Sequence, residues 1–199
     1  INVLGSVEGG ISNSGTIEAT TTGAAAIYVS GASASVTGGI SNVSTGSIIS
    51  GSSSANGIAI LSGASVAGGI SNNGLISGDS AAGIFVSASS VTGNITNNSG
   101  ADILGDAGIE MVASTLTGNI VNTGDILGAS VGIALYITSS VTGTITNNSG
   151  GLIEGGTYGI RLNSGSSVSG IINSGVIQST SGGTGIFVTT GSSVGSITN

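Results

Sequence analysis

Cysteine and histidine are absent from the sequence, and Arg161 is its only basic residue. A chain without thiols or imidazoles has no disulfides and lacks the ligands of most metal sites, so its stability has to come from backbone hydrogen bonds and aliphatic packing. The net charge of −7 argues against a nucleic-acid partner, because phosphate binding depends on clustered lysine and arginine.

Long apolar runs are also absent. No stretch approaches the roughly 18 to 20 apolar residues that a membrane-spanning helix needs, and no basic-then-apolar signal segment opens the chain. We therefore predict no transmembrane segment. The sequence begins at Ile1 and stops in the middle of a repeat at Asn199, so we expect a processed or excised piece of a longer protein.

Charge is scarce and glycine is abundant: nine of the 199 residues are charged, and 39 are glycine. This composition is typical of low-complexity segments. Isoleucine, valine and leucine nevertheless return at fixed positions, which a solvated linker has no reason to maintain. The pattern therefore predicts a folded chain.

One phrase recurs along the whole sequence. SVTGNITN at residues 90–97 returns as SVTGGISN at 35–42 and as SVTGTITN at 140–147. Each copy ends on an asparagine, and these asparagines are 25 to 30 residues apart. They are Asn13, Asn42, Asn72, Asn97, Asn122, Asn147, Asn173 and Asn199. A period of this length indicates a repeat architecture.

Each repeat contains three short segments with evenly spaced apolar residues. The first carries two aliphatic residues four positions apart, such as Val91 and Ile95, and the second carries one, such as Ile103. The third carries a pair two positions apart, such as Ile109 and Met111. Glycine precedes this pair in six of seven copies, where we expect a tight turn. Even spacing places each pair on one face of a strand.

Three strands per repeat, none long enough for an independent sheet, predict an all-β fold. We expect a right-handed parallel β-helix, or β-solenoid, of about seven coils of 25–30 residues. Residues 1–199 would form a single array in which each coil contacts mainly its neighbours. A leucine-rich repeat is the competing architecture at this period. The apolar residues recur with a period of two residues rather than the 3.6 residues of a helix, and Gly, Ser and Thr are abundant. Both features favour strands.

The closing asparagines fall where the first segment bends into the second. Asparagine tolerates left-handed backbone geometry, and stacked amides can hydrogen-bond along a rod. We therefore predict that the eight asparagines form a structural ladder rather than a ligand site.

Three of the five aromatic residues occupy the same outward position of the third segment: Tyr28, Phe85 and Phe187. A column of apolar side chains on a flat sheet predicts a lateral protein contact. Isolated exposed aromatic residues, which are common on soluble proteins, are the alternative interpretation.

Two polar features suggest ligands. Asp102 and Asp125 align in adjacent repeats and are the candidates for calcium, which prefers oxygen ligands, although the GGxGxD pattern of calcium-binding β-rolls is absent. Thr96, Thr144 and Thr146 belong to a polar face that loosely resembles the Thr-x-Thr lattice of ice-binding β-solenoids, and a glycan is the other ligand considered for it. Ordinary polar decoration of a solvated strand explains this face as well.

An enzyme is not expected. Polysaccharide lyases and hydrolases built on β-helices need clustered carboxylates with basic partners. Here Glu8, Glu18 and Glu154 are dispersed, and Arg161 is the only cation. We predict no catalytic residues, no cofactor and no cofactor-binding residues.

The phrases SVTGxITNxSGxI and GIxV resemble the repeats in the passenger regions of bacterial autotransporters and other large secreted adhesins, and the resemblance covers the whole chain. It implies a fibrous right-handed β-helix displayed outside a Gram-negative cell, at an extracellular or cell-surface location, where it serves attachment or aggregation.

Three functional hypotheses follow. The first is a rigid structural or adhesive stalk whose partner is another copy or a host or neighbouring cell surface. The second is a filament subunit whose copies stack end to end by strand addition, as in β-augmentation. The third is recognition of ice or a glycan on the Asn and Thr face.

Overall fold

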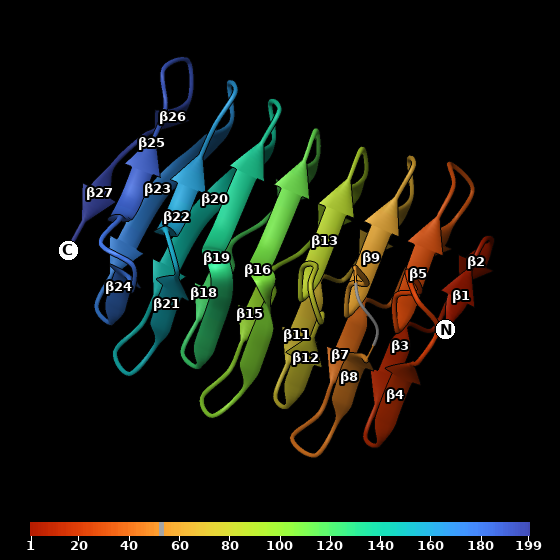
Figure 1. Cartoon of the computed structure of the whole chain (residues 1–199). Coiled ribbons are helices and arrows are strands. Elements are labelled where there is room, and N and C mark those ends of the chain that lie inside the picture. Colours follow the sequence, from red (N-terminus) through yellow and green to blue (C-terminus); the bar gives the residue numbers. More distant parts are fainter. Residues whose placement is uncertain (52–53) are drawn as a thin grey trace.

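The computed structural model describes residues 1–51 and 54–199. The chain winds into a rod in which short parallel strands of successive turns lie side by side (Figure 1). In Figure 1 the chain ascends along the nearer sheet, descends along the farther one and advances from right to left, so the coil is right-handed. None of the described residues forms a helix that could cross a membrane. The predicted all-β parallel solenoid is confirmed.

Among the described residues, two sheets of 13 and 14 strands form the walls of the rod. Each sheet consists of two columns of strands, and columns one and two belong to the 13-stranded sheet. Column one contains β4 (Thr16–Ala19), β8 (Ser47–Ser50), β12 (Leu75–Ser77), β16 (Asp102–Val112), β19 (Asp125–Tyr136), β21 (Leu152–Gly155) and β24 (Val176–Ser179). Column two contains β1 (Asn2–Val3), β5 (Ile27–Ser30), β9 (Ile58–Leu61), β13 (Ile84–Ser87), the later parts of β16 and β19, β22 (Tyr158–Leu162) and β25 (Thr184–Val188).

Columns three and four form the 14-stranded sheet. Column three contains β2 (Ser6–Val7), β6 (Ser35–Val36), β10 (Ser65–Ala67), β14 (Ser90–Thr92), β17 (Thr115–Thr117), β20 (Ser140–Asn147), β23 (Ser167–Asn173) and β26 (Ser193–Val194). Column four contains β3 (Ile11–Asn13), β7 (Ile40–Asn42), β11 (Ile70–Asn72), β15 (Ile95–Asn97), β18 (Ile120–Asn122), the later parts of β20 and β23, and β27 (Ile197–Thr198).

The structure has about eight turns rather than the predicted seven. Column three receives one strand from each turn, beginning with β2 in the partial first turn. The prediction of seven came from the intervals between eight asparagines and omitted this first turn.

The predicted first segment is usually split into two strands, and four of the described turns therefore have four strands rather than three: β4–β7, β8–β11, β12–β15 and β24–β27. Gly93 lies between β14 and β15 with φ at 104°, a conformation that glycine adopts without steric cost and that interrupts the strand. Gly143 does not have a positive φ, and β20 runs through it without a break.

Five columns of aliphatic side chains fill the interior. Each column takes one residue per turn, and the paired residues are identical or similar from turn to turn, as in Ile84, Ile109 and Ile133, all 0% exposed. The columns centre on Val91, Ile95, Ile103, Ile109 and Met111. Because successive side chains of a strand point to opposite faces, the residues between these anchors point outward.

The glycines before the third predicted segment, which forms the strands of column two, do not form the predicted tight turn. Gly108 does not have a positive φ. A Cβ atom there would lie 2.5 Å from Cγ2 of Ile126 and 2.8 Å from the carbonyl oxygen of Gly132. Glycine is therefore needed because two turns and the core approach each other closely at this position, and the buried Ala26 is its counterpart where the sequence departs from glycine.

Candidate contact surfaces

The eight asparagines lie in one column at the corner after column four. From Asn13 to Asn173, each Nδ2 donates a hydrogen bond to the Oδ1 of the asparagine in the next turn, at 2.7 to 3.0 Å. Each of these Nδ2 atoms also donates to a backbone carbonyl oxygen in its own corner, at 2.9 to 3.2 Å. Asn42, Asn72, Asn122 and Asn147 are fully buried. These four amides are committed to the rod and are not available to a ligand.

The amide chain has a direction. In every step the donor belongs to the earlier turn and the acceptor to the later one. The ladder therefore offers acceptors toward its N-terminal end and donors toward its C-terminal end.

A second column, of small side chains that are serine in five turns and alanine in two, lies at the corner between columns two and three and was not predicted from the sequence. Ser114 donates from Oγ to the carbonyl oxygens of Val112 at 2.8 Å and Val86 at 3.1 Å. The same Oγ accepts from the backbone N–H of Ser89 at 3.3 Å. Its members precede the first aliphatic anchor by two positions and are always small: Ala34, Ala64, Ser89, Ser114, Ser139, Ser166 and Ser192. That fixed offset is the signal that could have identified it.

The three aromatic residues predicted as a lateral contact share one outward register position but do not form one patch. Tyr28 and Phe85 are separated by Ala59, which is 1% exposed. Phe85 and Phe187 lie four turns apart in this column. All three side chains are half-buried.

Phe187 instead joins an aromatic cluster around Arg161, the only basic side chain of the sequence. Its ring stacks on that of Tyr158, with centroids 4.8 Å apart. The guanidinium carbon of Arg161 lies 5.1 Å from the centroid of the Tyr158 ring and 5.3 Å from that of Tyr136. Two aromatic faces at these distances stabilise the cation. Tyr136 and Tyr158 were not predicted as site residues, because they lie outside the aromatic column.

Phe85 borders a shallow acidic groove of about 300 Å³. Asn56, Ser80, Asp106 and Glu110 also line it. Partial burial raises the pKa of Glu110, and the neighbouring charge of Asp106 raises it further. Asp106 is exposed and accepts a hydrogen bond from Ser130 at 2.6 Å.

Asp102 and Asp125, the calcium candidates, are direct neighbours in the register of β16 and β19. Burial raises the pKa of Asp102, and the charge of Asp125 adds to this effect. Within residues 1–51 and 54–199, no three acidic, histidine or cysteine side chains come together as metal ligands. The pair alone offers two carboxylates, whereas calcium takes six to eight oxygen ligands.

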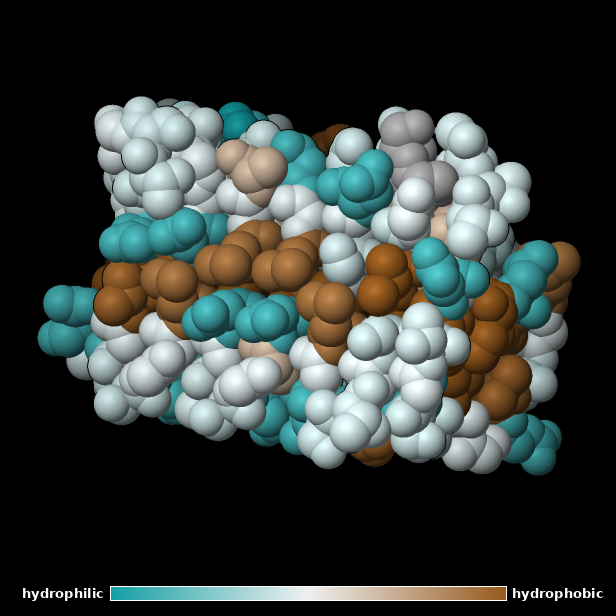
Figure 2. All heavy atoms as spheres, turned by 60° about the horizontal axis from the view of Figure 1, so that its bottom comes forward, coloured by the Kyte–Doolittle hydropathy of each residue, from teal (hydrophilic) through white to brown (hydrophobic). Residues whose placement is uncertain are grey.

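An apolar stripe runs along the outward side of column one. Figure 2, which brings forward the side of the rod with β4, β8, β12, β21 and β24, shows a band of hydrophobic side chains bordered by hydrophilic ones. The pairing register places one aliphatic residue per turn on this side. The members of the stripe are Ile49, Leu75, Leu104, Leu127, Leu152 and Val176. The first five are half-buried, and Val176 is 49% exposed.

The polar face considered for ice or a glycan is irregular. Its outward column in β15, β18, β20 and β23 reads Thr96, Val121, Thr146 and Ile172. Ile172 is 40% exposed. An evenly spaced threonine lattice is therefore interrupted at every second turn in this region.

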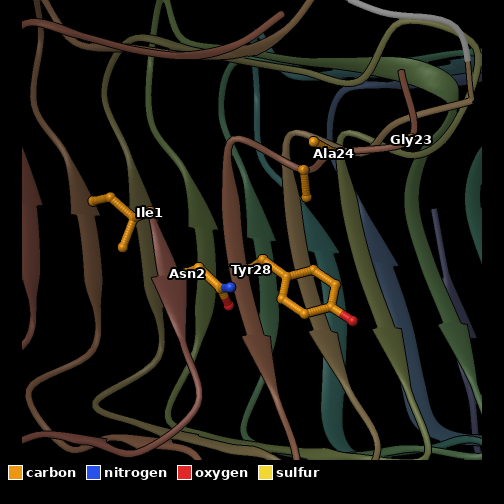
Figure 3. A pocket seen from close by; sticks show the side chains of 6 residues that line it. Ile1, Asn2, Gly23, Ala24 and Tyr28 are labelled. Atoms are coloured by element: carbon orange, nitrogen blue, oxygen red, sulfur yellow. The ribbon is translucent and has the colours of Figure 1, made fainter. Parts of the chain in front are cut away.

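A hollow of about 340 Å³ lies beside Tyr28 in the first turns (Figure 3). Its other lining residues are Ile1, Asn2, Gly23, Ala24 and Ala25. The lining includes no carboxylate, so the hollow offers a phenol, an amide and the backbone as polar groups.

The chain was compared with family models, curated proteins and solved structures, and nothing in any of the three matches it.

Proposed function

We propose that the chain is a rigid structural and adhesive rod of an extracellular, bacterial cell-surface protein, and that the outward faces of its sheets make the contacts. The observation that carries this proposal is the continuous register of parallel strands through about eight turns, with a hydrogen-bonded asparagine column inside it. Seven steps of about 4.8 Å give a rod roughly 34 Å long.

Stiffness follows from this arrangement. Each inner turn is hydrogen-bonded to the turns on both sides along four columns of strands. Stretching or bending the rod breaks several of these ladders together, in addition to exposing the aliphatic columns. The interior is committed to structure, so contacts with partners belong to the outward side chains.

The surface chemistry favours contact over catalysis. Its distinctive features are the apolar stripe, the aromatic cluster around Arg161 and the acidic groove beside Phe85. With one cation and neither histidine nor cysteine, the chain offers few groups for general acid–base or nucleophilic chemistry. The resemblance to secreted adhesin repeats supports the external location.

Clustering of beads coated with the purified chain tests the adhesive role. We expect coated beads to cluster with one another or to attach to bacterial or host cells. A matched control is Ile109→Asp, which places a carboxylate in the dry interior at a residue 0% exposed and unfolds the rod. Equal clustering or attachment by the unfolded variant would show that the rod is not what adheres.

A second candidate, an end-to-end filament, is favoured by the direction of the asparagine ladder. Because acceptors face one end and donors the other, a second rod in the same orientation would continue both the ladder and the parallel strands. Electron microscopy separates the two candidates: continuous axial filaments support stacking, and separate short rods support the lateral adhesive module.

A further inference from the structure

The outward side of column one has a regular composition. In each of six consecutive turns, the two residues that flank the inward-pointing isoleucine of column one are one aliphatic and one polar residue. The flanking pairs are Ser47 and Ile49, Leu75 and Ser77, Asp102 and Leu104, Asp125 and Leu127, Leu152 and Glu154, and Val176 and Gln178. The turn before them carries Thr16 and Glu18 and has no aliphatic residue here.

The register divides these residues into two rows along the rod. The leading row, before the isoleucine, reads Ser47, Leu75, Asp102, Asp125, Leu152 and Val176. The trailing row, after it, reads Ile49, Ser77, Leu104, Leu127, Glu154 and Gln178.

The inner four turns are symmetric about their midpoint, between the turns of Leu104 and Leu127. In the two turns next to the midpoint, the aliphatic residue is in the trailing row, at Leu104 and Leu127. In the next turn outward on each side, it is in the leading row, at Leu75 and Leu152. After a two-fold rotation about an axis parallel to the strands, a surface with this internal symmetry places its aliphatic residues opposite aliphatic residues.

We propose that the apolar stripe is the contact between two copies of the chain, whose rods run antiparallel and face each other across this two-fold axis. This inference rests on the proposed adhesive function and names its partner and geometry. In the dimer Leu104 faces Leu127 of the other copy, and Leu75 faces Leu152 of the other copy. Ser77 faces Glu154 of the other copy, which supplies an acceptor for the hydroxyl.

A two-fold pairing is isologous, with the same patch on both copies, which explains why the pattern is symmetric. A different protein docking on the stripe would impose no such symmetry. The symmetric contact covers four turns, which are three steps of about 4.8 Å, and two side-chain positions, so it buries on the order of 200 Å² per copy, below the roughly 800 Å² of a standard interface. The association is therefore weak for isolated rods and strengthened where many copies face each other on opposing surfaces.

The same symmetry places Asp102 of one copy opposite Asp125 of the other. Both aspartates are already neighbours within each copy, so four carboxylates meet at the centre of the contact. Like charges at this distance oppose association. Removing these charges should strengthen the dimer, whereas removing the central leucines should weaken it.

The first test is sedimentation equilibrium at neutral pH. We expect Asp102→Asn with Asp125→Asn to lower the dimer dissociation constant at least tenfold relative to the wild type. Adding Leu104→Ser and Leu127→Ser to this variant should raise the dimer dissociation constant at least tenfold relative to the aspartate-free variant. Val121→Ser, at a half-buried outward position of the other sheet, is the matched control and should leave it unchanged.

The geometry is tested by cysteine cross-linking, since the natural chain has no cysteine. In the aspartate-free variant, copies with Leu75→Cys mixed with copies with Leu152→Cys should form a disulfide-linked heterodimer under mild oxidation. Leu75→Cys alone should form few homodimers, because the two Leu75 positions lie three turns apart along the paired rods. Preferential Leu75–Leu75 linkage would overturn the antiparallel arrangement.

Two outcomes distinguish this inference from the proposed function. If beads coated with the wild type cluster and the Leu104→Ser, Leu127→Ser variant clusters equally, the adhesive function stands and the stripe is not its contact. If wild-type beads neither cluster nor attach to cells, the proposed function fails, whereas dimers with the expected cross-link would still support the pairing of two rods.

Discussion

At the scale of single residues, a substitution at Gly108 tests whether adjoining turns lie too close together there for a side chain. We expect Gly108→Ala to lower the free energy of unfolding by about 1 to 3 kcal/mol, because the new methyl group meets both the Ile126 side chain and the Gly132 carbonyl. Thermal and urea denaturation followed by circular dichroism measure the change.

The control for this substitution is Gly15→Ala. A Cβ atom at Gly15 has no heavy atom within 4 Å, and this glycine does not have a positive φ. Its replacement should change stability by no more than about 0.5 kcal/mol. Equal losses at Gly108 and Gly15 would contradict the packing explanation.

Glu110 gives the protein a predictable response to acid. Burial, followed by the charge of Asp106, raises the pKa of Glu110 above its usual value of 4.5, so the folded chain holds this proton more tightly than the unfolded chain does. Stability contributed by this group therefore increases as the pH falls through the raised pKa toward 4.5. Asp102 acts in the same direction, because its pKa is also raised.

We expect the melting temperature to rise when the pH is lowered from 7 toward 4.5. Glu110→Gln should raise the melting temperature at pH 7 and reduce the gain on acidification. Glu8→Gln, at an exposed carboxylate, is the control. A wild-type melting temperature that falls steadily over this range, with no difference in Glu110→Gln, would refute the assignment.

Sequence reasoning located some of these residues and missed others for physical reasons. The asparagines were visible because each turn needs the same amide at the same corner. Ser114 and its column were missed because the position holds alanine in two turns and serine in five, and small residues next to a glycine-rich bend resemble ordinary bend residues. The apolar stripe was missed because its members change between two positions around the isoleucine, so no single aligned position is consistently apolar.

At the scale of elements, the strands of columns one and two could be predicted from alternation, but their ends could not. The bend between these columns becomes continuous strand in β16 and β19, with a register irregularity after Gly105. In the other turns separate strands form instead. The aliphatic anchors are present in both cases, so their presence does not reveal where a strand ends.

The corner after β19 contains a strained residue. Ile137 has φ at 51° and is 54% exposed. The left-handed conformation costs a residue with a side chain roughly 1 to 2 kcal/mol, and a β-branched residue is especially unfavourable there. The equivalent corner carries Gly31 in an earlier turn, with φ at 107°.

We expect Ile137→Gly to stabilise the protein by about 1 kcal/mol, since it removes this strain and sacrifices little buried surface. Ile137→Ala keeps the Cβ atom and should gain less. Urea denaturation of the three proteins gives the order directly. A loss of stability in Ile137→Gly would mean that the isoleucine makes contacts that outweigh the strain.

At the scale of the whole molecule, stability is a sum over turns and their interfaces, because each turn contacts mainly its neighbours. The core side chains are least exposed to solvent in the middle turns: Ile103, Ile126 and Ile153 are 0% exposed, whereas Ile17 and Ile177 in the same column are only partly buried. Opening should therefore begin at the outer turns of this chain and move inward.

Hydrogen exchange measured by mass spectrometry tests this gradient. Peptides from β16 to β20 should exchange most slowly, and those before β5 or after β23 should exchange fastest. Gly108→Ala should speed exchange mainly in the turns that contain β13, β16 and β19, because its clashes are with the adjoining turn. Uniform exchange along the rod, or a uniform acceleration by the substitution, would mean that the solenoid opens as one cooperative unit rather than turn by turn.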